Sequence, residues 1–307
     1  MLDCVIVGAG PAGLTAAIYA ARFRLRVRVV DGGASRAGLI PLTRNQAGFP
    51  DGISGVELLS RMNRQAALYE AEATRGVVAG LTIDAGAFQV RGDFGELAAR
   101  TVLLATGVTS LRPDISDGTH RDALQSGRLR YCPVCDGYEV TDQNVAVIGT
   151  GDRGLAETTF LRSYTTRLTL LPHEAPHRLT ADQRARLRAL GVTVKEHPAR
   201  ILDLAPEGVI LSSGDERLAF DAVYPALGSV PHSDLGRGLG ADVTDDGSLR
   251  VDAHQRTSVP GLYAAGDVVL GLDQISHAMG EAGVAATTIR NDLAERTSLL
   301  RGAPGRL

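Results

Sequence analysis

The sequence is poor in cysteine, in charge of one sign and in uninterrupted apolar runs, and each shortage excludes a class of protein. Three cysteines among 307 residues are too few, and wrongly spaced, for the disulfide framework of a small secreted domain. The 32 basic residues nearly balance the 35 acidic ones and form no block, so we expect no nucleic-acid partner and no acidic-lipid partner. The apolar stretch 4–21 is interrupted by glycine and proline and lacks a preceding basic segment, which excludes a membrane helix and an export signal. We therefore expect a cytoplasmic protein with no membrane association and no targeting signal at either end.

The N-terminal segment predicts a strand, a glycine-rich turn, a helix and a second strand. Apolar residues 2–7 are followed by the turn Gly8-Ala9-Gly10-Pro11-Ala12-Gly13, by an alanine-rich helix to about Arg22, and by a strand that ends at Asp31. A GxGxxG turn in this position is typical of a dinucleotide-binding fold, because its glycines permit the tight turn, the approach of a pyrophosphate and close helix–strand packing. The helix start offers free N–H groups to the phosphates, and Asp31 would accept hydrogen bonds from an adenosine ribose. An ordinary glycine turn is the alternative.

A second segment of the same design begins near residue 145. Residues 145–148 predict a strand, 155–163 a helix and 168–171 the next strand, and the turn between them is Gly149-Thr150-Gly151-Asp152-Arg153-Gly154. Two such units imply two nucleotide sites, an arrangement that moves electrons between a flavin and a second carrier.

The first unit is expected to resume late in the chain, so that the second is inserted into it. The buried strand at 102–104 has a counterpart at 262–265, and a helix at about 280–293 would close the chain over the first domain. A chain of 307 residues is about twice the length of a domain of roughly 150 residues, which also favours two domains. We predict an α/β fold with two Rossmann-like, three-layer domains. The first comprises residues 1–113 and 247–307, and the inserted one comprises residues 114–246.

A CxxC motif lies just ahead of the second unit, at Cys132 and Cys135. Cysteines two residues apart on a turn or helix start can form a strained disulfide, with one thiolate stabilised by the helix end. The adjoining Asp136 could hold or release the proton that thiol exchange requires. Inert thiols and a zinc half-site are the alternatives, but no second CxxC follows. His173 and His177 are four residues apart but flank Pro176, which disfavours a helical metal pair, so we expect no metal. Cys4 falls inside the first strand and is expected to be a small core residue without a redox role.

Together these motifs resemble the low-molecular-weight bacterial thioredoxin reductases and their disulfide-oxidoreductase relatives. Matching segments at 45–50, 105–107, 257–267 and 274–286 follow the family's order and spacing. The resemblance implies a homodimeric FAD enzyme of the glutathione-reductase fold type, in which residues 1–113 and 247–307 bind FAD. The inserted, pyridine-nucleotide-type domain then carries the CxxC.

The resemblance also assigns roles to individual residues. Cys135 would be the thiol nearest the flavin, Cys132 the interchange thiol that attacks the substrate, and Asp136 the acid/base. Residues implied to contact FAD are Gly8, Gly10, Ala12, Gly13, Asp31, Asn45, Thr106, Gly107, Gly266, Asp267 and the backbone of Gln274 and Ile275. Residues implied to contact the second nucleotide are Gly149, Gly151, Gly154, Glu174 and Arg178.

The second nucleotide site departs from the family pattern. NADPH-using members carry a His-Arg-Arg-x-x-x-Arg run whose arginines hold the 2′-phosphate, whereas residues 172–178 read PHEAPHR here. Glu174 would repel that phosphate, and each lost arginine contact removes roughly 1.5–3 kcal/mol. NADPH is therefore disfavoured. NADH stays open, because Glu174 could accept from a 2′-hydroxyl, and so does electron exchange with ferredoxin, another protein or oxygen.

Two further departures concern the flavin site. Asp273 replaces the arginine that usually precedes the Gln-Ile pair, and residues 32–36 replace the usual Gly-Gly-Gln-Leu after the ribose acid; both are expected to alter flavin potential or substrate access. His277 is a candidate base near the isoalloxazine, or else a solvent-edge histidine at a helix start.

The sequence as a whole predicts an FAD-dependent disulfide oxidoreductase. Electrons would pass between the flavin, the Cys132–Cys135 pair and an external partner, either a thioredoxin-like protein or a small-molecule disulfide or dithiol, with lost or weakened NADPH recognition. The alternatives are an NADH- or ferredoxin-linked reductase, a dithiol oxidase and a non-enzymatic flavin redox sensor.

Overall fold

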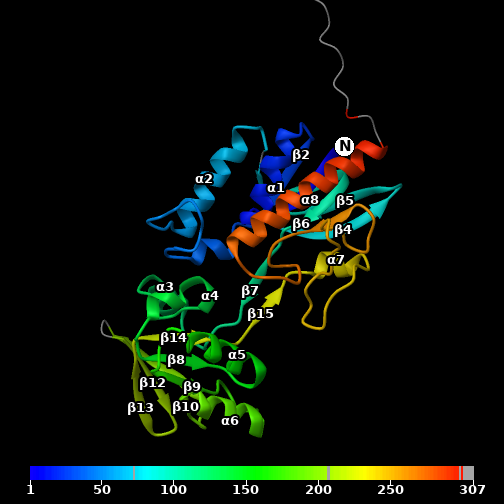
Figure 1. The fold of residues 1–307 in the computed structure, drawn as a ribbon. Helices are drawn as coiled ribbons and strands as arrows, with labels where there is room; N and C mark the ends of the chain where they lie inside the picture. Colours follow the sequence, from blue (N-terminus) through cyan, green and yellow to red (C-terminus); the bar gives the residue numbers. More distant parts are fainter. Residues whose placement is uncertain (72, 206–207, 297–298, 300–307) are drawn as a thin grey trace, which may run out of the picture. The chain divides into compact units, whose positions relative to one another are not determined.

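The computed structural model describes residues 1–71, 73–205, 208–296 and 299 and has the predicted α/β character (Figure 1). The chain divides into two compact units. Unit 1 comprises Met1–Gly38, Val56–Val108 and Pro231–Leu307, and unit 2 comprises Leu39–Gly55 and Thr109–Val230. Each unit is built around its own sheet. Within the described ranges, no helix has both the length and the apolar character that crossing a membrane requires.

The sheet of unit 1 has seven strands in the order β3-β2-β1-β6-β5-β4, with β16 also paired to β6. The strands are β1 (Leu2–Val7), β2 (Val27–Asp31), β3 (Ala73–Arg75), β4 (Val78–Asp84), β5 (Ala87–Gly92), β6 (Gly95–Leu104) and β16 (Leu262–Ala264). Strands β3, β2, β1, β6 and β16 run parallel, and β4 and β5 form an antiparallel meander with β6. Parallel strands are covered on both faces, which explains why residues 4–7 of β1 and 102–104 of β6 are continuous apolar runs rather than alternating ones.

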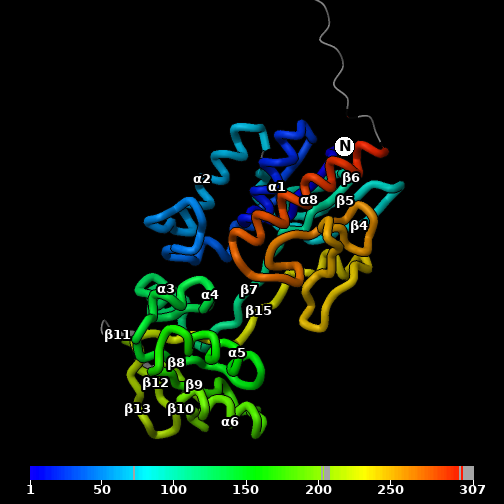
Figure 2. Tube along the Cα trace, viewed as in Figure 1, coloured from blue at the N-terminus to red at the C-terminus, as the bar shows by residue number. Residues whose placement is uncertain are grey.

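Helices α1 (Pro11–Arg22) and α8 (Ile275–Arg296) pack against each other in unit 1 (Figure 2). Both helices are rich in buried alanine, whose small side chain lets packed backbones approach closely. The buried alanines are Ala12, Ala16, Ala17 and Ala20 of α1 and Ala278, Ala282, Ala285 and Ala286 of α8. The remaining helices of this unit are η1 (Arg36–Leu39), α2 (Gly55–Ala67) and α7 (Asp234–Gly238). The predicted C-terminal helix is confirmed, but it begins at Ile275 instead of near residue 280.

Unit 2 has a parallel sheet in the order β10-β9-β8-β14 and a separate antiparallel sheet β11-β12-β13. The strands are β8 (Val145–Ile148), β9 (Leu168–Leu171), β10 (Thr193–Val194), β11 (Ala199–Ala205), β12 (Gly208–Ser213), β13 (Glu216–Phe220) and β14 (Ala222–Pro225). The helices are α3 (Asp117–Gln125), α4 (Pro133–Asp136), η2 (Gly137–Val140), α5 (Gly151–Leu161) and α6 (Ala181–Ala189). Two short strands, β7 (Val108–Ser110) and β15 (Ser229–Pro231), pair where the chain leaves unit 1 and where it returns.

The return to unit 1 comes at Pro231, earlier than the polar stretch at 245–247 that the sequence suggested as a boundary. Residues 231–246 contribute Leu235, Leu239 and Val243, which pack on the buried cluster of the unit 1 sheet. The polar stretch itself forms a turn closed by a bridge between Val243 and Leu249. Apolar side chains therefore attach this segment to unit 1, although its surface residues are polar.

Candidate functional site

The first GxGxxG turn joins β1 to α1 with the geometry of a dinucleotide cradle. Gly8 has a φ of +105°, a conformation that strongly favours glycine. An added Cβ at Gly13 would overlap the carbonyl oxygen of Gly8, so the third glycine is needed for the helix to pack against the turn. Gly10 is the N-cap of α1 and provides no side-chain cap, which leaves the first N–H groups of the helix for a ligand. These residues fit the pyrophosphate of FAD.

Asp31, the acidic residue at the end of β2, is hydrogen-bonded within the turn that follows it. The Oδ1 atom of Asp31 accepts a hydrogen bond from the Gly33 N–H at 2.8 Å. Thr106 and Gly107 follow β6 at the neighbouring strand end, where Thr106 donates its hydroxyl to the His232 carbonyl oxygen at 2.7 Å. Since β1, β2 and β6 are parallel neighbours, their carboxyl ends lie at one edge of the sheet.

The two departures from the family pattern in unit 1 meet in one ion-pair cluster. Arg36 Nη1 lies 3.0 Å from Asp267 Oδ2 and 3.0 Å from Asp273 Oδ2. Burial raises the pKa of Asp267, the Asp273 carboxylate raises it further, and the Arg36 guanidinium opposes both effects. Arg36 and Asp273 therefore form a compensating pair of opposite charge, which the separate sequence positions did not reveal.

A second carboxylate, that of Glu281 in α8, has two partners within unit 1. His277 Nε2 lies 3.1 Å from Glu281 Oε1, and Glu281 Oε2 accepts from the Gly266 N–H at 2.7 Å. Burial raises the pKa of Glu281. Gln274 directly precedes the helix, and its carbonyl accepts the Ala278 N–H at 2.9 Å. Sequence reasoning missed Glu281, although its spacing of four residues from His277 on a helix was the available signal.

The CxxC motif lies in unit 2, where Cys132 and Cys135 are joined in a disulfide at a Cα–Cα distance of 5.2 Å. Cys132 is the N-cap of the short helix α4, and the Cys135 N–H donates to the Cys132 sulfur at 3.1 Å. An N–H directed at this sulfur stabilises negative charge on it. Cys4 is buried and free, as predicted, and burial raises the pKa of its thiol to about 12.

Both oxygens of the Asp136 carboxyl group are bonded within unit 2. Arg130 Nη1 donates to Oδ2 at 2.8 Å, and the hydroxyl of Tyr224 on β14 donates to Oδ1 at 2.8 Å. Burial raises the pKa of Asp136. Neither Arg130 nor Tyr224 was singled out from the sequence, in which Tyr224 reads as an ordinary core aromatic.

Asn45, predicted to contact FAD, belongs to unit 2. Thr43 donates its hydroxyl to Asn45 Oδ1 at 2.7 Å, and Asn45 Nδ2 lies 3.5 Å from the Val134 carbonyl oxygen. This places Asn45 beside the CxxC turn.

The second GxGxxG turn joins β8 to α5 and repeats the close packing of the first. An added Cβ at Gly154 would lie 2.9 Å from the Gly149 carbonyl carbon, and Gly151 has a φ of +60°. Thr150, the N-cap of α5, accepts the Arg178 N–H on its hydroxyl at 2.7 Å. The helix begins at Gly151, four residues earlier than predicted, because the turn glycines form its first residues.

The acidic residues of this second site differ in exposure. Glu174 has a side chain that is 85% exposed, and its Oε1 lies 3.4 Å from His173 Nε2. Glu157 lies on α5 with a buried Oε2 that has no hydrogen-bond partner, and burial raises its pKa to about 7. Glu157 was not identified as a site residue from the sequence, because a single acidic residue in the helix after a GxGxxG turn is not a recognisable motif.

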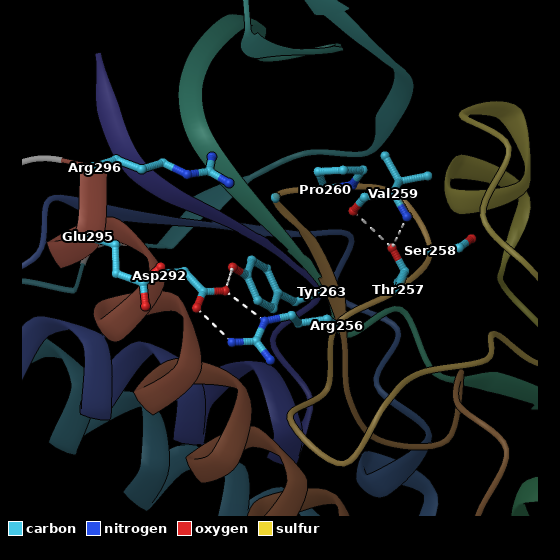
Figure 3. A pocket seen from close by; sticks show the side chains of 10 residues that line it. Arg256, Thr257, Ser258, Val259, Pro260, Tyr263, Asp292, Glu295 and Arg296 are labelled. Carbon is cyan, nitrogen blue, oxygen red and sulfur yellow. Dashed lines mark hydrogen bonds and ion pairs between the residues drawn. The ribbon is translucent and has the colours of Figure 1, made fainter.

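A surface pocket of about 360 Å³ in unit 1 is lined by none of the predicted site residues (Figure 3). Its polar walls are paired with one another: Arg256 Nε and Nη2 donate to the two oxygens of Asp292 at 2.8 and 2.7 Å, and the Tyr263 hydroxyl donates to the same carboxylate at 2.6 Å. This arrangement ties the end of α8 to the loop before β16.

Among the described residues, no group of three or more histidine, cysteine or acidic side chains could hold a metal ion.

The fold and these sites define an α/β protein with two dinucleotide-binding folds and an adjacent disulfide. The profile of the family "Pyridine nucleotide-disulphide oxidoreductase" matches residues 2–282. A thioredoxin reductase from Mycolicibacterium smegmatis is 31% identical, over 87% of this chain and 88% of its own length. The crystal structure of HlmI matches with a TM-score of 0.87 at 32% identity, covering 96% of this chain and 93% of HlmI. Thioredoxin reductase from Streptococcus pyogenes MGAS5005 matches with a TM-score of 0.88 at 28% identity, covering 96% and 99%.

The chain therefore belongs to the pyridine nucleotide-disulphide oxidoreductase family, as a thioredoxin-reductase-like flavoprotein. The predicted resemblance and fold class are confirmed.

Proposed function

We propose that this protein is an FAD-dependent disulfide oxidoreductase that passes electrons between FAD, the Cys132–Cys135 pair and an external disulfide or dithiol. The observation that carries the proposal is the disulfide at residues 132 and 135, held at the start of α4 with an N–H directed at the Cys132 sulfur. The relatives named as thioredoxin reductases favour a thioredoxin-like protein as the partner.

FAD would be held in unit 1. The N–H groups at the start of α1, beside Gly10, would bind its pyrophosphate, and Asp31 would bind its adenosine ribose. Asp267 and the backbone at Gln274 and Ile275 would contact the remainder, as the family positions imply. When bound, FAD supplies the two-electron chemistry that interconverts a disulfide and a dithiol.

In the reduced pair, the chain's own residues carry the sulfur and proton chemistry. The Cys132 thiol gives its proton to Asp136, and the Cys132 sulfur attacks a partner disulfide, forming one S–S bond as the partner's bond breaks. The leaving partner thiolate takes that proton. The Cys135 sulfur then attacks Cys132, which restores the internal disulfide and releases the second partner sulfur as a thiol with the Cys135 proton. The partner is reduced by two electrons, and the pair is oxidised by two.

Substitution of each cysteine tests this function. Cys132→Ser and Cys135→Ser should each reduce dithiol–disulfide turnover to background while the protein keeps its flavin. The measurement is turnover with several dithiol and disulfide substrates. Full turnover in both variants with every substrate would exclude the disulfide mechanism.

We further propose that NADPH is recognised poorly. Glu174 stands where the family has an arginine. Arg184 of α6 does not replace that arginine, because its Nη2 already donates a hydrogen bond to Glu196 Oε2 at 3.1 Å. In anaerobic stopped-flow measurements, dithiothreitol should bleach the flavin, whereas NADPH at micromolar concentration should not. Rapid bleaching by NADPH would contradict this part of the proposal, and bleaching by NADH alone would identify the donor class.

A further inference from the structure

The carboxyl group of Asp136 accepts hydrogen bonds from two separate parts of unit 2, a loop and a strand. Arg130, in the segment before the CxxC, donates to Oδ2, and Tyr224, in the central sheet, donates to Oδ1, both at 2.8 Å. The Tyr224 hydroxyl also lies 3.3 Å from the Asp136 backbone carbonyl oxygen. These contacts fix both the side chain and the backbone of the residue that follows Cys135.

Tyr224 is suited to a fixed donor role. It is fully buried in β14, which pairs with β8 at the Tyr224–Val147 position. Burial, together with the Asp136 carboxylate, raises the pKa of its hydroxyl well above the usual range, so the hydroxyl keeps its proton. Tyr224 thus attaches the end of α4 to the sheet that carries the second nucleotide turn.

Arg130 is also held in place. Its Nε donates to the Gly127 carbonyl oxygen at 2.9 Å, so the guanidinium spans the loop and the carboxylate. Its side chain is 19% exposed, which reduces screening of its charge by water.

The charges around Asp136 oppose one another. Burial and the carboxylate of Glu139 raise the pKa of Asp136, whereas Arg130 and the Tyr224 hydroxyl lower it. Glu139 in turn lies 3.6 Å from Arg44 Nη1. Both donors stabilise the charged form of this carboxyl group, so the loss of either donor raises its pKa further.

We propose that Arg130 and Tyr224 are positioning residues, which fix the Asp136 carboxylate for proton exchange with the reduced Cys132–Cys135 pair. This inference rests on the proposed disulfide oxidoreductase function. Neither residue forms part of the CxxC-Asp motif itself.

The test is the pH dependence of Cys132 alkylation by iodoacetamide in the dithiothreitol-reduced holoprotein, with the modified cysteine identified by mass spectrometry. Asp136→Asn should abolish the inflection that the carboxylate contributes. Tyr224→Phe should move this inflection to higher pH by about half to one unit, because one donor to the charged form is lost. Arg130→Gln should move it in the same direction, and Arg130→Lys should restore most of the wild-type profile.

Tyr263→Phe is the matched control, because it also removes a buried hydroxyl that donates to a carboxylate, but in unit 1. It should leave the inflection unchanged. An inflection that survives Asp136→Asn, or a Tyr224→Phe shift no larger than that of Tyr263→Phe, would overturn the inference. This assay needs neither an electron donor nor a partner, so its failure is distinguishable from retention of turnover in Cys132→Ser, which would overturn the function itself.

Discussion

The two glycine turns share a backbone design but differ in how their polar neighbours are paired. In unit 1, the carboxylates near the turn are bonded to the protein itself: Asp267 pairs with Arg36, and Glu281 holds the Gly266 N–H and pairs with His277. In unit 2, Glu174 is largely exposed and lies 3.4 Å from the adjoining His173, and one oxygen of Glu157 is buried without a hydrogen-bond partner. A site whose side chains are fixed in advance suits a cofactor that stays bound, and a site with exposed or unpartnered carboxylates suits a ligand that exchanges.

The largest difference between the turns should appear when the third glycine of each is replaced. Gly13→Ala would place a Cβ on the Gly8 carbonyl oxygen, so α1 must shift and the phosphate cradle is lost. We expect purified Gly13→Ala protein to lack flavin, measured as flavin absorbance per protein. The matched Gly154→Ala change should leave flavin content at the wild-type level. Equal flavin content in the two variants would show that the first turn does not hold the cofactor.

A smaller effect is expected from restoring the basic pair in unit 2. His173→Arg combined with Glu174→Arg removes a repelling carboxylate and supplies charge-assisted contacts of roughly 1.5–3 kcal/mol each. NADPH affinity should increase by at least about tenfold for each restored contact, measured by the concentration dependence of anaerobic flavin reduction.

The control for this double variant is Glu216→Arg, which reverses an exposed charge of the same unit that pairs with Lys195. It should change NADPH affinity little. A similar gain from this control would show that net charge, rather than position, governs the binding.

The sequence predicted most of the backbone because its signals are local. Buried parallel strands give continuous apolar runs, and each GxGxxG turn fixes a strand end and a helix start within a few residues. Several of the side-chain pairs were not predictable, because their members are far apart in sequence. Arg36 meets Asp273 across 237 positions, and Asp136 meets Tyr224 across 88. Such a pair depends on the packing of whole elements, which no single segment encodes.

The smallest effect is expected from the Arg256–Asp292 ion pair of unit 1. Its removal tests whether ion pairs also stabilise unit 1 away from the candidate site. The Arg256 guanidinium, through its hydrogen bonds, lowers the pKa of Asp292 below its usual range. A lowered pKa in the folded state means that this carboxylate stabilises the fold above its unfolded pKa, and that the contribution is lost as pH falls through the folded pKa. Asp292→Asn should therefore lower the free energy of unfolding by about 1–3 kcal/mol at neutral pH.

That loss should shrink as the solution is acidified, because the wild-type carboxylate then becomes neutral as well. The measurement is denaturant unfolding of both proteins over a pH series, with turnover as a second readout that should not change. Asp245→Asn, an exposed substitution in the same unit, is the control and should have little effect at any pH. A difference between Asp292→Asn and wild type that stays constant at acid pH would show that Arg256 recognises the shape of this side chain rather than its charge. The Arg256–Asp292 pair of unit 1 would then stabilise the fold by packing. In that case, charge would not explain how this pair differs from the exposed and unpartnered carboxylates of unit 2.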